Sequence, residues 1–383
     1  MKKLAIIGAS YLQVPLIQKA KDMGIETHVF AWAANDVGEE IADVFYPISI
    51  IEKEQILKKC QEIKIDGICS IASDLAAITV NYVADAMGLV CNSPECAKIS
   101  TNKHLMRKAF AANGDPSPKS ILVSDVKELE GINLQYPVIV KPLDRSGSRG
   151  ITKLTSPKGI EQAIENAKAE GFEKGALVEE FAEGQEYSIE CISWKGEHHF
   201  LAMTKKYTTG APHFIETGHI EPANVSKNME KKVKAIVFHA LDSLKIENGA
   251  SHTELKIDEE GNIKLIEIGG RMGGDFIGSS LVALSTGFDF VRAVIDVALG
   301  KSPDFEYEHI NKKAAVRYIF SKQDIEVYDR LMSSHPEYIV YSEINEVTEE
   351  TVTDSSNRFG CFVMQAGIEV QLEEYLQEDF YAK

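Results

Sequence analysis

The sequence predicts an α/β domain followed by α+β structure, and three observations support this fold class. Apolar runs of strand length alternate with amphipathic helical runs over about residues 1–97, which is typical of a doubly wound parallel sheet with helices on its faces. A Pro-rich joint at 115–118 introduces a mixed segment of strands and a helix over about 117–190. From about residue 186 long strand-like runs predominate, which favours antiparallel pairing.

In the first domain strands and helices alternate along the chain. We predict strands at 3–9, 25–32 and 65–73 and helices at 11–24, 53–64, 75–88 and 99–114. Ligands of parallel sheets bind beyond the carboxyl ends of the strands. The residues at those ends, which become candidate substrate contacts, are Ser10, Tyr11, Ser73 and Asp74. The first turn lacks G-x-G-x-x-G, so a nicotinamide-binding site is disfavoured.

The remaining elements divide the chain further. We predict strands at 119–123, 137–141, 151–154 and 175–181, antiparallel strands within 186–207 and 249–270, and helices at 157–170 and 288–301. Strands at 314–320 and 360–367 indicate a small C-terminal α+β unit. The predicted domains are therefore residues 1–97, residues 98–300 with a subdomain over about 117–190, and residues 301–383.

Composition excludes several classes of partner. The 383 residues carry a formal net charge of −17, which repels nucleic acid and anionic membranes, so we expect neither as a partner. No apolar run approaches the roughly 18 residues of a membrane span. The six cysteines contain no C-x-x-C pair, which is typical of reduced thiols and predicts a cytoplasmic protein.

The stretch "VIVKPLDRSGSRGI", residues 138–151, combines a strand-end lysine with a small, basic loop. Lys141 ends the strand, and the loop that follows includes Ser146, Gly147 and Ser148. Loops of Gly and Ser leave backbone N–H groups free to bind an anion, which favours a phosphate. The lysine precedes the loop, so this is not a P-loop. An exposed basic turn is the alternative interpretation, and this stretch alone does not decide between them.

A predicted hairpin around Gly261 places two carboxylates opposite each other. If residues 259–262 form the turn, Glu254 faces Glu267 with Cβ atoms about 5 Å apart. Such a pair repels unless one carboxyl holds a proton or a cation lies between them, and its oxygen ligands suit Mg²⁺ or Mn²⁺. The alternative is a solvated pair neutralised by Lys256. Arg271, in the glycine-rich "EIGGRMGGD", could clamp a phosphate or carboxylate, or form a surface ion pair.

Two further segments offer candidate ligand contacts. In "VEEFAEGQEYSIE", Val178 and Phe181 could supply an apolar slot for adenine and Glu186 an acceptor for ribose hydroxyls, although an acidic solvated hairpin explains the same spacing. His219, in "ETGHIEP", could contact substrate or help remove a proton, or be an ordinary loop histidine.

Six motifs in order, "TNKHLMR", "VIVKPLDRSGSRG", "VEEFAEGQEYSIE", "ETGHIEP", "HTELKI" and "LIEIGGRMGG", resemble the ATP-grasp superfamily across about residues 1–300. The resemblance implies an ATP-grasp fold with a Rossmann-like pre-ATP-grasp domain, in which 117–190 is the lid subdomain. It implies that Lys103 and Lys141 meet ATP phosphates under the 146–150 loop. By the same resemblance, residues 178–181, which include Glu179, Glu180 and Phe181, form the adenine hinge, and Glu186 is the ribose acceptor. Glu254 and Glu267 match the metal ligands, and Arg271 matches the arginine that faces the phosphoryl group.

The resemblance also implies a function. "HTE" and "EIGGR" look more like the amino-acid ligase branch, which implies an ATP- and Mg²⁺-dependent carboxylate–amine ligase acting on small molecules through an acyl phosphate. Many members have Asn where this chain has Gly269, which leaves open whether one or two metal ions bind. A purine-pathway ligase of the phosphoribosylamine–glycine ligase type and a nucleotide-binding regulatory protein are the alternatives. The oligomeric state stays open, with a homodimer as one option.

Overall fold

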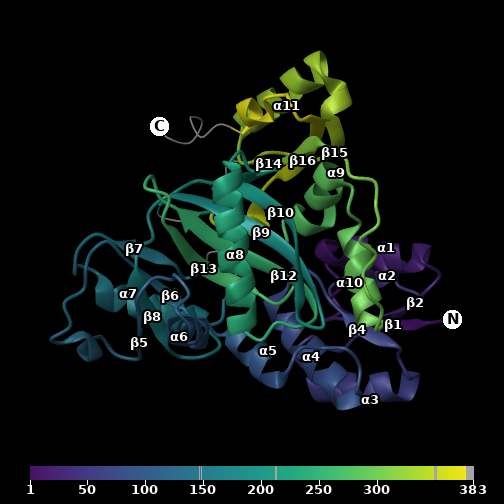
Figure 1. The fold of residues 1–383 in the computed structure, drawn as a ribbon, viewed down its shortest axis with the longest axis horizontal. Helices are drawn as coiled ribbons and strands as arrows, with labels where there is room; N and C mark the ends of the chain where they lie inside the picture. The colour runs from purple at the N-terminus through teal and green to yellow at the C-terminus, as the bar shows by residue number, and fades with distance from the viewer. Residues whose placement is uncertain (146, 148, 212–213, 349–351, 377–383) are drawn as a thin grey trace.

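The computed structural model describes residues 1–145, 147, 149–211, 214–348 and 352–376, and three sheets organise these residues (Figure 1). One sheet has four parallel strands, one has four antiparallel strands, and one has eight antiparallel strands. The parallel sheet comes first in the chain, so the predicted order of α/β followed by α+β structure is confirmed.

The N-terminal sheet has the strand order β3-β2-β1-β4. Its strands are β1 (Lys3–Ile7), β2 (Glu26–Phe30), β3 (Val44–Tyr46) and β4 (Gly67–Cys69). The helices around it are η1 (Tyr11–Gln13), α1 (Val14–Asp22), α2 (Val37–Ile41), α3 (Lys53–Ile63) and α4 (Asp74–Met87). The prediction missed β3 and α2, because three and five residues are too few to show a periodic pattern.

The helix predicted at 99–114 is two helices in the structure. These are α5 (Pro94–Thr101) and α6 (Lys103–Asn113). Asn102 separates them because its extended backbone ends α5 while its side chain accepts a hydrogen bond from the Leu105 N–H and caps α6. The break places Lys103 at the first position of α6, so that it lies at a helix start rather than on a helix face.

The second sheet has the strand order β5-β8-β6-β7. It comprises β5 (Ser120–Val123), η2 (Val126–Leu129), β6 (Val138–Pro142), β7 (Thr152–Leu154), α7 (Ile160–Glu170) and β8 (Ala176–Glu180). The predicted hairpin is confirmed, since Val138 pairs with Leu154 across β6 and β7. Ser146 and Ser148 of its loop lie outside the described residues.

The eight-stranded sheet has the order β13-β12-β9-β10-β11-β14-β16-β15. The part before residue 301 comprises β9 (Gln185–Trp194), β10 (Glu197–Thr208), β11 (Glu216–Glu221), α8 (Lys227–Ser243), β12 (Gly249–Ile257), β13 (Ile263–Gly269), η3 (Ile277–Leu281), α9 (Val282–Thr286) and α10 (Phe290–Ala298). The part after it comprises β14 (Lys312–Tyr318), α11 (Lys322–Ser334), η4 (Pro336–Tyr338), β15 (Ile339–Ile344), η5 (Ser355–Asn357), β16 (Gly360–Gly367) and η6 (Leu372–Tyr375).

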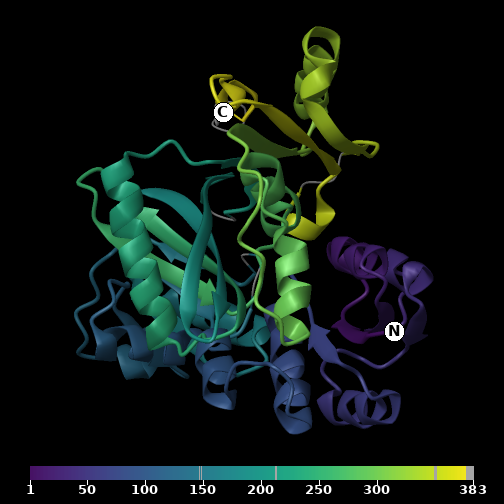
Figure 2. The same cartoon turned by 45° about the vertical axis from the view of Figure 1, so that its right-hand side comes forward.

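The C-terminal strands extend the large sheet, because β14 pairs with β11 through four residues (Figure 2). The predicted boundary near residue 300 therefore crosses a continuous sheet, and the division into domains stays a prediction. Among the described residues, no helix has the length and apolar character needed to cross a membrane.

The two faces of the large sheet differ in chemistry. One face packs against α8, which crosses the strands in Figure 1, through buried apolar residues such as Ile189, Leu255 and Val237. Side chains alternate between faces along a strand, so the neighbouring residues Ser188, Glu190 and Glu254 face the other way. The second sheet approaches the polar face, whereas α5 and α6 contribute Cys96, Met106 and Phe110 to the apolar cluster around α8.

Candidate active site

A cavity of about 170 Å³ lies between the second sheet and the polar face of the large sheet. It brings together residues that the sequence predicted separately. These predicted residues line it: Lys103, Lys141, Gly147, Glu179, Glu180, Phe181, Glu186, Glu254, Glu267 and Arg271. Ser10, Tyr11 and His219 lie outside it, and Ser73 and Asp74 line a neighbouring cavity.

Lys141 lies at the end of β6, with only 5% of its side chain exposed, in an ion pair with Glu179. Arg107 of α6 also holds Glu179, through a 3.1 Å contact from Nε to Oε2. Burial alone raises the pKa of Glu179, but Arg107 and Lys141 outweigh it and hold the pKa below its usual value. The Glu179 carboxylate is therefore already paired with side chains of the protein. Any contact of this hinge with an adenine base would have to come from the backbone of β8.

The predicted pairing of Glu254 with Glu267 is confirmed, although the turn was predicted wrongly. The turn spans Asp258–Asn262, with the Asp258 N–H bonded to the Asn262 carbonyl at 3.1 Å. The strand pairing that this turn sets would, by itself, offset Glu254 and Glu267 by one residue. A bulge at Ile266, between Leu265 and Glu267, shifts the pairing by one residue and brings them opposite each other.

In the structure a different lysine lies beside each of these two carboxylates. Lys206 donates to Glu254 at 2.6 Å, and Lys103 donates to Glu267 at 2.6 Å. Burial raises the pKa of Glu254, but Lys206 and His252 together hold it well below its usual value. Each carboxylate has its own lysine partner, and neither partner is Lys256.

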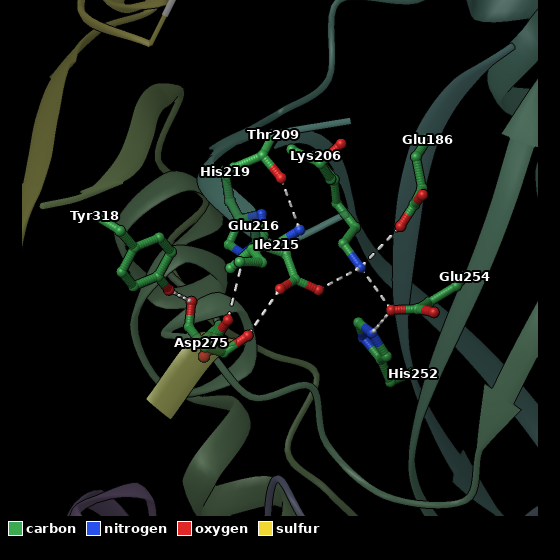
Figure 3. A network of polar contacts seen from close by, with 12 residues as sticks. Glu186, Lys206, Thr209, Ile215, Glu216, His219, His252, Glu254, Asp275 and Tyr318 are labelled. Atoms are coloured by element: carbon green, nitrogen blue, oxygen red, sulfur yellow. Dashed lines mark hydrogen bonds and ion pairs between the residues drawn. The ribbon is translucent and has the colours of Figure 1, made fainter. Parts of the chain in front are cut away.

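Lys206 is a site residue that the sequence analysis missed. Its Nζ lies 2.6 Å from Glu254, 3.0 Å from Glu186 and 3.6 Å from Glu216, and 4% of its side chain is exposed (Figure 3). Burial lowers its pKa, but the three carboxylates outweigh burial and raise it well above its usual value. The alternation of side chains along β10 could have identified Lys206, because it places Lys206 on the same face as Thr204 and opposite the Glu-rich strand β9.

A second polar cluster joins β11, the loop after β13 and the C-terminal segment (Figure 3). Arg358 donates both terminal nitrogens to Asp275, at 3.1 and 3.0 Å, and the Tyr318 hydroxyl donates to the Asp275 carbonyl at 2.9 Å. His219 Nε2 lies 4.0 Å from Asp275 Oδ2. His219 is fully buried on β11, so it is not a loop histidine, and burial lowers its pKa.

The predicted Tyr11 lies near this cluster, although it comes from the first domain. Tyr11 is 58% exposed. Its partial burial raises the pKa of Tyr11, and the carboxylate of Asp275 raises it further. Arg358 and Asp275 were both missed by the sequence analysis, since Arg358 is 83 residues from its partner and in a unit to which no site was assigned.

Arg271 forms a two-point ion pair with Asp74 at the start of α4, at 2.8 and 2.9 Å. Gly269 lies against this pair, because a Cβ added there would come within 2.6 Å of Asp74 Oδ1. A larger residue at position 269 would therefore have to displace the Asp74 carboxylate from its place beside Arg271. Behind it, Glu190 accepts from the Gly273 N–H at 2.9 Å and pairs with His252. Burial lowers the pKa of His252, but Glu190 outweighs it and raises the pKa to about 9.

The comparisons with known proteins identify an ATP-grasp domain within this fold. Residues 134–279 match the family model described as an ATP-grasp domain, so the chain contains such a domain and the resemblance is confirmed. The chain is 27% identical to the alanine–anticapsin ligase of Bacillus subtilis (strain 168) over 305 residues, which cover 70% of this chain and 64% of that protein. The chain therefore spans less than two thirds of this relative.

Solved structures share the fold over nearly the whole chain. The L-amino acid ligase from Bacillus licheniformis superposes with a TM-score of 0.81 at 23% identity, covering 100% of this chain and 96% of that one. A biotin carboxylase domain from Hydrogenobacter thermophilus, in complex with MgADP, superposes with a TM-score of 0.74 at 16% identity, covering 95% of this chain and 86% of that one. At these identities the similarity establishes the fold.

Proposed function

We propose that this protein is an ATP- and Mg²⁺-dependent carboxylate–amine ligase that works through an acyl phosphate. A substrate carboxylate attacks the γ-phosphorus of ATP, giving the acyl phosphate and ADP. The amine nitrogen then bonds to the acyl carbon, the C–O bond to phosphate breaks, and the departing phosphate accepts the proton that the nitrogen loses. The observation that carries the proposal is the opposed pair Glu254 and Glu267, beside Arg271 and in one cavity with buried Lys141.

In this proposal ATP occupies the 170 Å³ cavity. Lys141 and Lys103 bind its phosphates together with the backbone of Gly147, whose left-handed φ of 70° suits a glycine loop. The hinge at Glu180 and Phe181 borders the adenine, and Glu186 accepts from the ribose. The similar fold of a protein solved with MgADP supports a nucleotide in this place.

The donor set fits a Mg²⁺ ion, and Mn²⁺ would suit the same ligands. Among the described residues no group of three or more His, Cys, Asp or Glu side chains could hold a metal by itself. Two carboxylates completed by phosphate oxygens are, however, the usual environment of Mg²⁺ in nucleotide sites. Bound by Glu254 and Glu267, the ion would neutralise charge on the β- and γ-phosphates.

The protein's own residues supply positioning and charge. Arg271 faces the position of the transferring phosphoryl group, with its guanidinium plane fixed by Asp74. Lys206 adds a second buried positive charge beside Glu254. Ser73 and Asp74, which line the neighbouring cavity, are candidate substrate contacts in this proposal, together with Ser10, Tyr11 and His219. The neutral imidazole that burial favours at His219 can accept a hydrogen bond or a proton.

The proposal also includes three general statements about the lid subdomain, the substrates and the location of the enzyme. Residues 117–190 form the subdomain that covers the nucleotide, the substrates are small molecules, and the enzyme acts in the cytoplasm. A homodimer is compatible with it. The relative named as an alanine–anticapsin ligase supports amino-acid-type substrates.

The test is to incubate the protein with ATP, Mg²⁺, hydroxylamine and a panel of carboxylates, and to analyse the nucleotides. Release of ADP with formation of a hydroxamate is expected for the correct carboxylate. Release of AMP would refute the acyl-phosphate mechanism. A requirement for a ribose phosphate amine would favour the purine-pathway alternative, and nucleotide binding without turnover on any panel would favour the regulatory one.

A further inference from the structure

Residues 271–276 lie between β13 and η3 and begin with Arg271, and we call this segment the arginine loop. Its backbone is strained at the end that precedes η3. Asp275 and Phe276 both adopt the left-handed conformation, with φ of 50° and 64°. This conformation is unfavourable for a residue with a side chain, above all for a bulky one such as Phe276. Such strain persists only where the surrounding structure holds it, and it is frequent at functional sites.

The first half of the arginine loop is held by the first domain and by the large sheet. Asp74 fixes the Arg271 guanidinium through two hydrogen bonds, at 2.8 and 2.9 Å. The Ala72 N–H donates to the Met272 carbonyl at 3.1 Å. The Gly273 N–H donates to a carboxylate of β9 at 2.9 Å. Each residue from 271 to 273 therefore has a partner outside the loop.

The second half of the loop is held by the C-terminal part of the chain. Tyr318, the last residue of β14, donates its hydroxyl to the Asp275 carbonyl at 2.9 Å, and Figure 3 shows this hydroxyl directed at Asp275. Arg358 donates two hydrogen bonds to the Asp275 carboxylate and stacks on the Tyr318 ring, 3.6 Å from its centroid. Tyr318 is buried. Its hydroxyl thus holds the backbone of the strained pair, whereas Arg358 holds a side chain.

The middle of the loop is closely packed, so that its two halves are mechanically connected. A Cβ added at Gly273 would lie 2.7 Å from a Glu190 oxygen, and one added at Gly278 of η3 would overlap Met272 Cγ. Met272 itself is fully buried. Closely packed interiors transmit a displacement instead of absorbing it. A backbone shift at Asp275 is therefore expected to reach the guanidinium at the start of the loop.

We propose that Tyr318 is a positioning residue for the proposed phosphoryl transfer, and that its hydroxyl holds the arginine loop in the strained form that directs Arg271 at the transferring group. The inference rests on the proposed function and gives the C-terminal part of the chain a role in it. Tyr318 is not among the described residues that line the cavity of about 170 Å³, so it acts through Asp275. The binding of ATP by Lys103 and Lys141 does not require it.

Tyr318→Phe removes only the hydroxyl, and Tyr328→Phe is its matched control. Tyr328 lies on α11, in the same part of the chain, with its hydroxyl 3.1 Å from Ser342 Oγ. The rate of hydroxamate formation and the thermal midpoint are measured for both variants, with the carboxylate found in the screen. We expect Tyr318→Phe to lower kcat by about tenfold, as for the loss of one buried hydrogen bond. The KM values for ATP and the carboxylate should stay within about twofold of the wild type, because Arg271 acts in the transition state. Tyr328→Phe should keep the wild-type kcat.

Phe276→Asn provides the measurement that separates positioning from a general loss of stability. Asn adopts the left-handed conformation more readily than Phe, so the loop of this variant needs less support from Tyr318. In a double-mutant cycle, Tyr318→Phe should cost about tenfold in kcat in the wild-type background but less than about threefold in the Phe276→Asn background. The cycle cancels the ring contact with Tyr341 that Phe276→Asn removes from both of its members.

The outcomes distinguish this inference from the proposed function. An unchanged kcat of Tyr318→Phe, beside a wild type that forms the hydroxamate, would overturn the inference. So would an equal loss of kcat in both backgrounds, or a loss that only follows unfolding at the assay temperature, since the hydroxyl would then serve the fold and not the loop. Failure of the wild type to form any hydroxamate would instead remove the ligase function and the inference with it.

Discussion

Replacement of Arg358 by alanine tests whether the C-terminal segment holds the substrate side of the site together. Arg358 holds Asp275 with two hydrogen bonds, at 3.0 and 3.1 Å, and only 5% of its side chain is exposed. Unit charges about 4 Å apart interact by about 4 kcal/mol at an effective dielectric constant near 20. Removing one member of a buried pair typically costs about 3–5 kcal/mol. Because 23% of the Asp275 side chain is exposed, we expect about 3 kcal/mol, near the lower limit.

The pH dependence of this loss has a defined sign. Burial raises the pKa of Asp275, but Arg358 and His219 outweigh it and hold the pKa below its usual value. A carboxyl group with a lowered folded-state pKa stabilises the protein above its unfolded-state pKa, which is 3.8 here. That stabilisation is lost as the pH falls below this value. The difference between wild type and Arg358→Ala should therefore be largest near neutral pH and shrink below about pH 4.

Urea unfolding followed by circular dichroism at pH 7 and below pH 4 measures both effects. Arg330→Ala, on the exposed part of α11, is the matched control and should stay within about 0.5 kcal/mol of the wild type. Asp275→Asn and the double variant complete a cycle, with a coupling of about 2–3 kcal/mol expected at neutral pH. A loss of stability that does not change with pH, or a double-mutant cycle without coupling, would contradict the ion-pair explanation. The effect of Arg358 would then be due to its packing on Tyr318.

Four further substitutions address the cavity of about 170 Å³. Lys141→Ala should lower turnover by about 10²–10³-fold without unfolding the chain, since Arg107 still holds Glu179; an unchanged rate would remove Lys141 from the site. Glu254→Gln and Glu267→Gln should each raise the Mg²⁺ concentration needed for activity, Glu267→Gln more strongly, and equal Mg²⁺ titrations of variant and wild type would make the pair structural. Lys206→Met should lower the thermal midpoint, and Mg²⁺ should restore part of it by replacing the missing charge beside Glu254; calorimetry with and without Mg²⁺ decides.

The sequence was informative where local pattern determines the outcome. Strand alternation and turn residues predicted that Glu254 lies opposite Glu267. The turn is one residue longer than predicted, which would offset this pair, and the bulge at Ile266 restores the predicted pairing. A single strand-end lysine beside a glycine loop identified Lys141. In each case the relevant neighbours lie within one hairpin, so the pattern of a few residues sufficed.

Side chains whose ion-pair partners meet them only in the folded chain were not predicted. Lys206 needs carboxylates from three other strands before its role is visible. Arg107 joins α6 to β8 across 72 residues, and Arg358 reaches Asp275 across 83. Nothing in the local sequence of an arginine shows which distant carboxylate it will meet. The missed residues are therefore those whose partners the tertiary packing brings together.

In the proposed function, the charges of the cavity of about 170 Å³ also favour the joint binding of ATP and Mg²⁺. Lys141, Lys206 and Lys103 are each held by at least one carboxylate. ATP alone would take Lys103 from Glu267 and leave that carboxylate beside the phosphates, where like charges repel. Mg²⁺ alone would meet carboxylates that already hold ammonium groups. In the proposed function, Lys103 would move from Glu267 to a phosphate and a Mg²⁺ ion held by Glu254 and Glu267 would take its place, so every charge would keep a partner. In the proposed function the nucleotide and the metal ion therefore bind as one unit, and the ion pairs of the free protein hold the carboxylates and lysines close to the positions that this exchange requires.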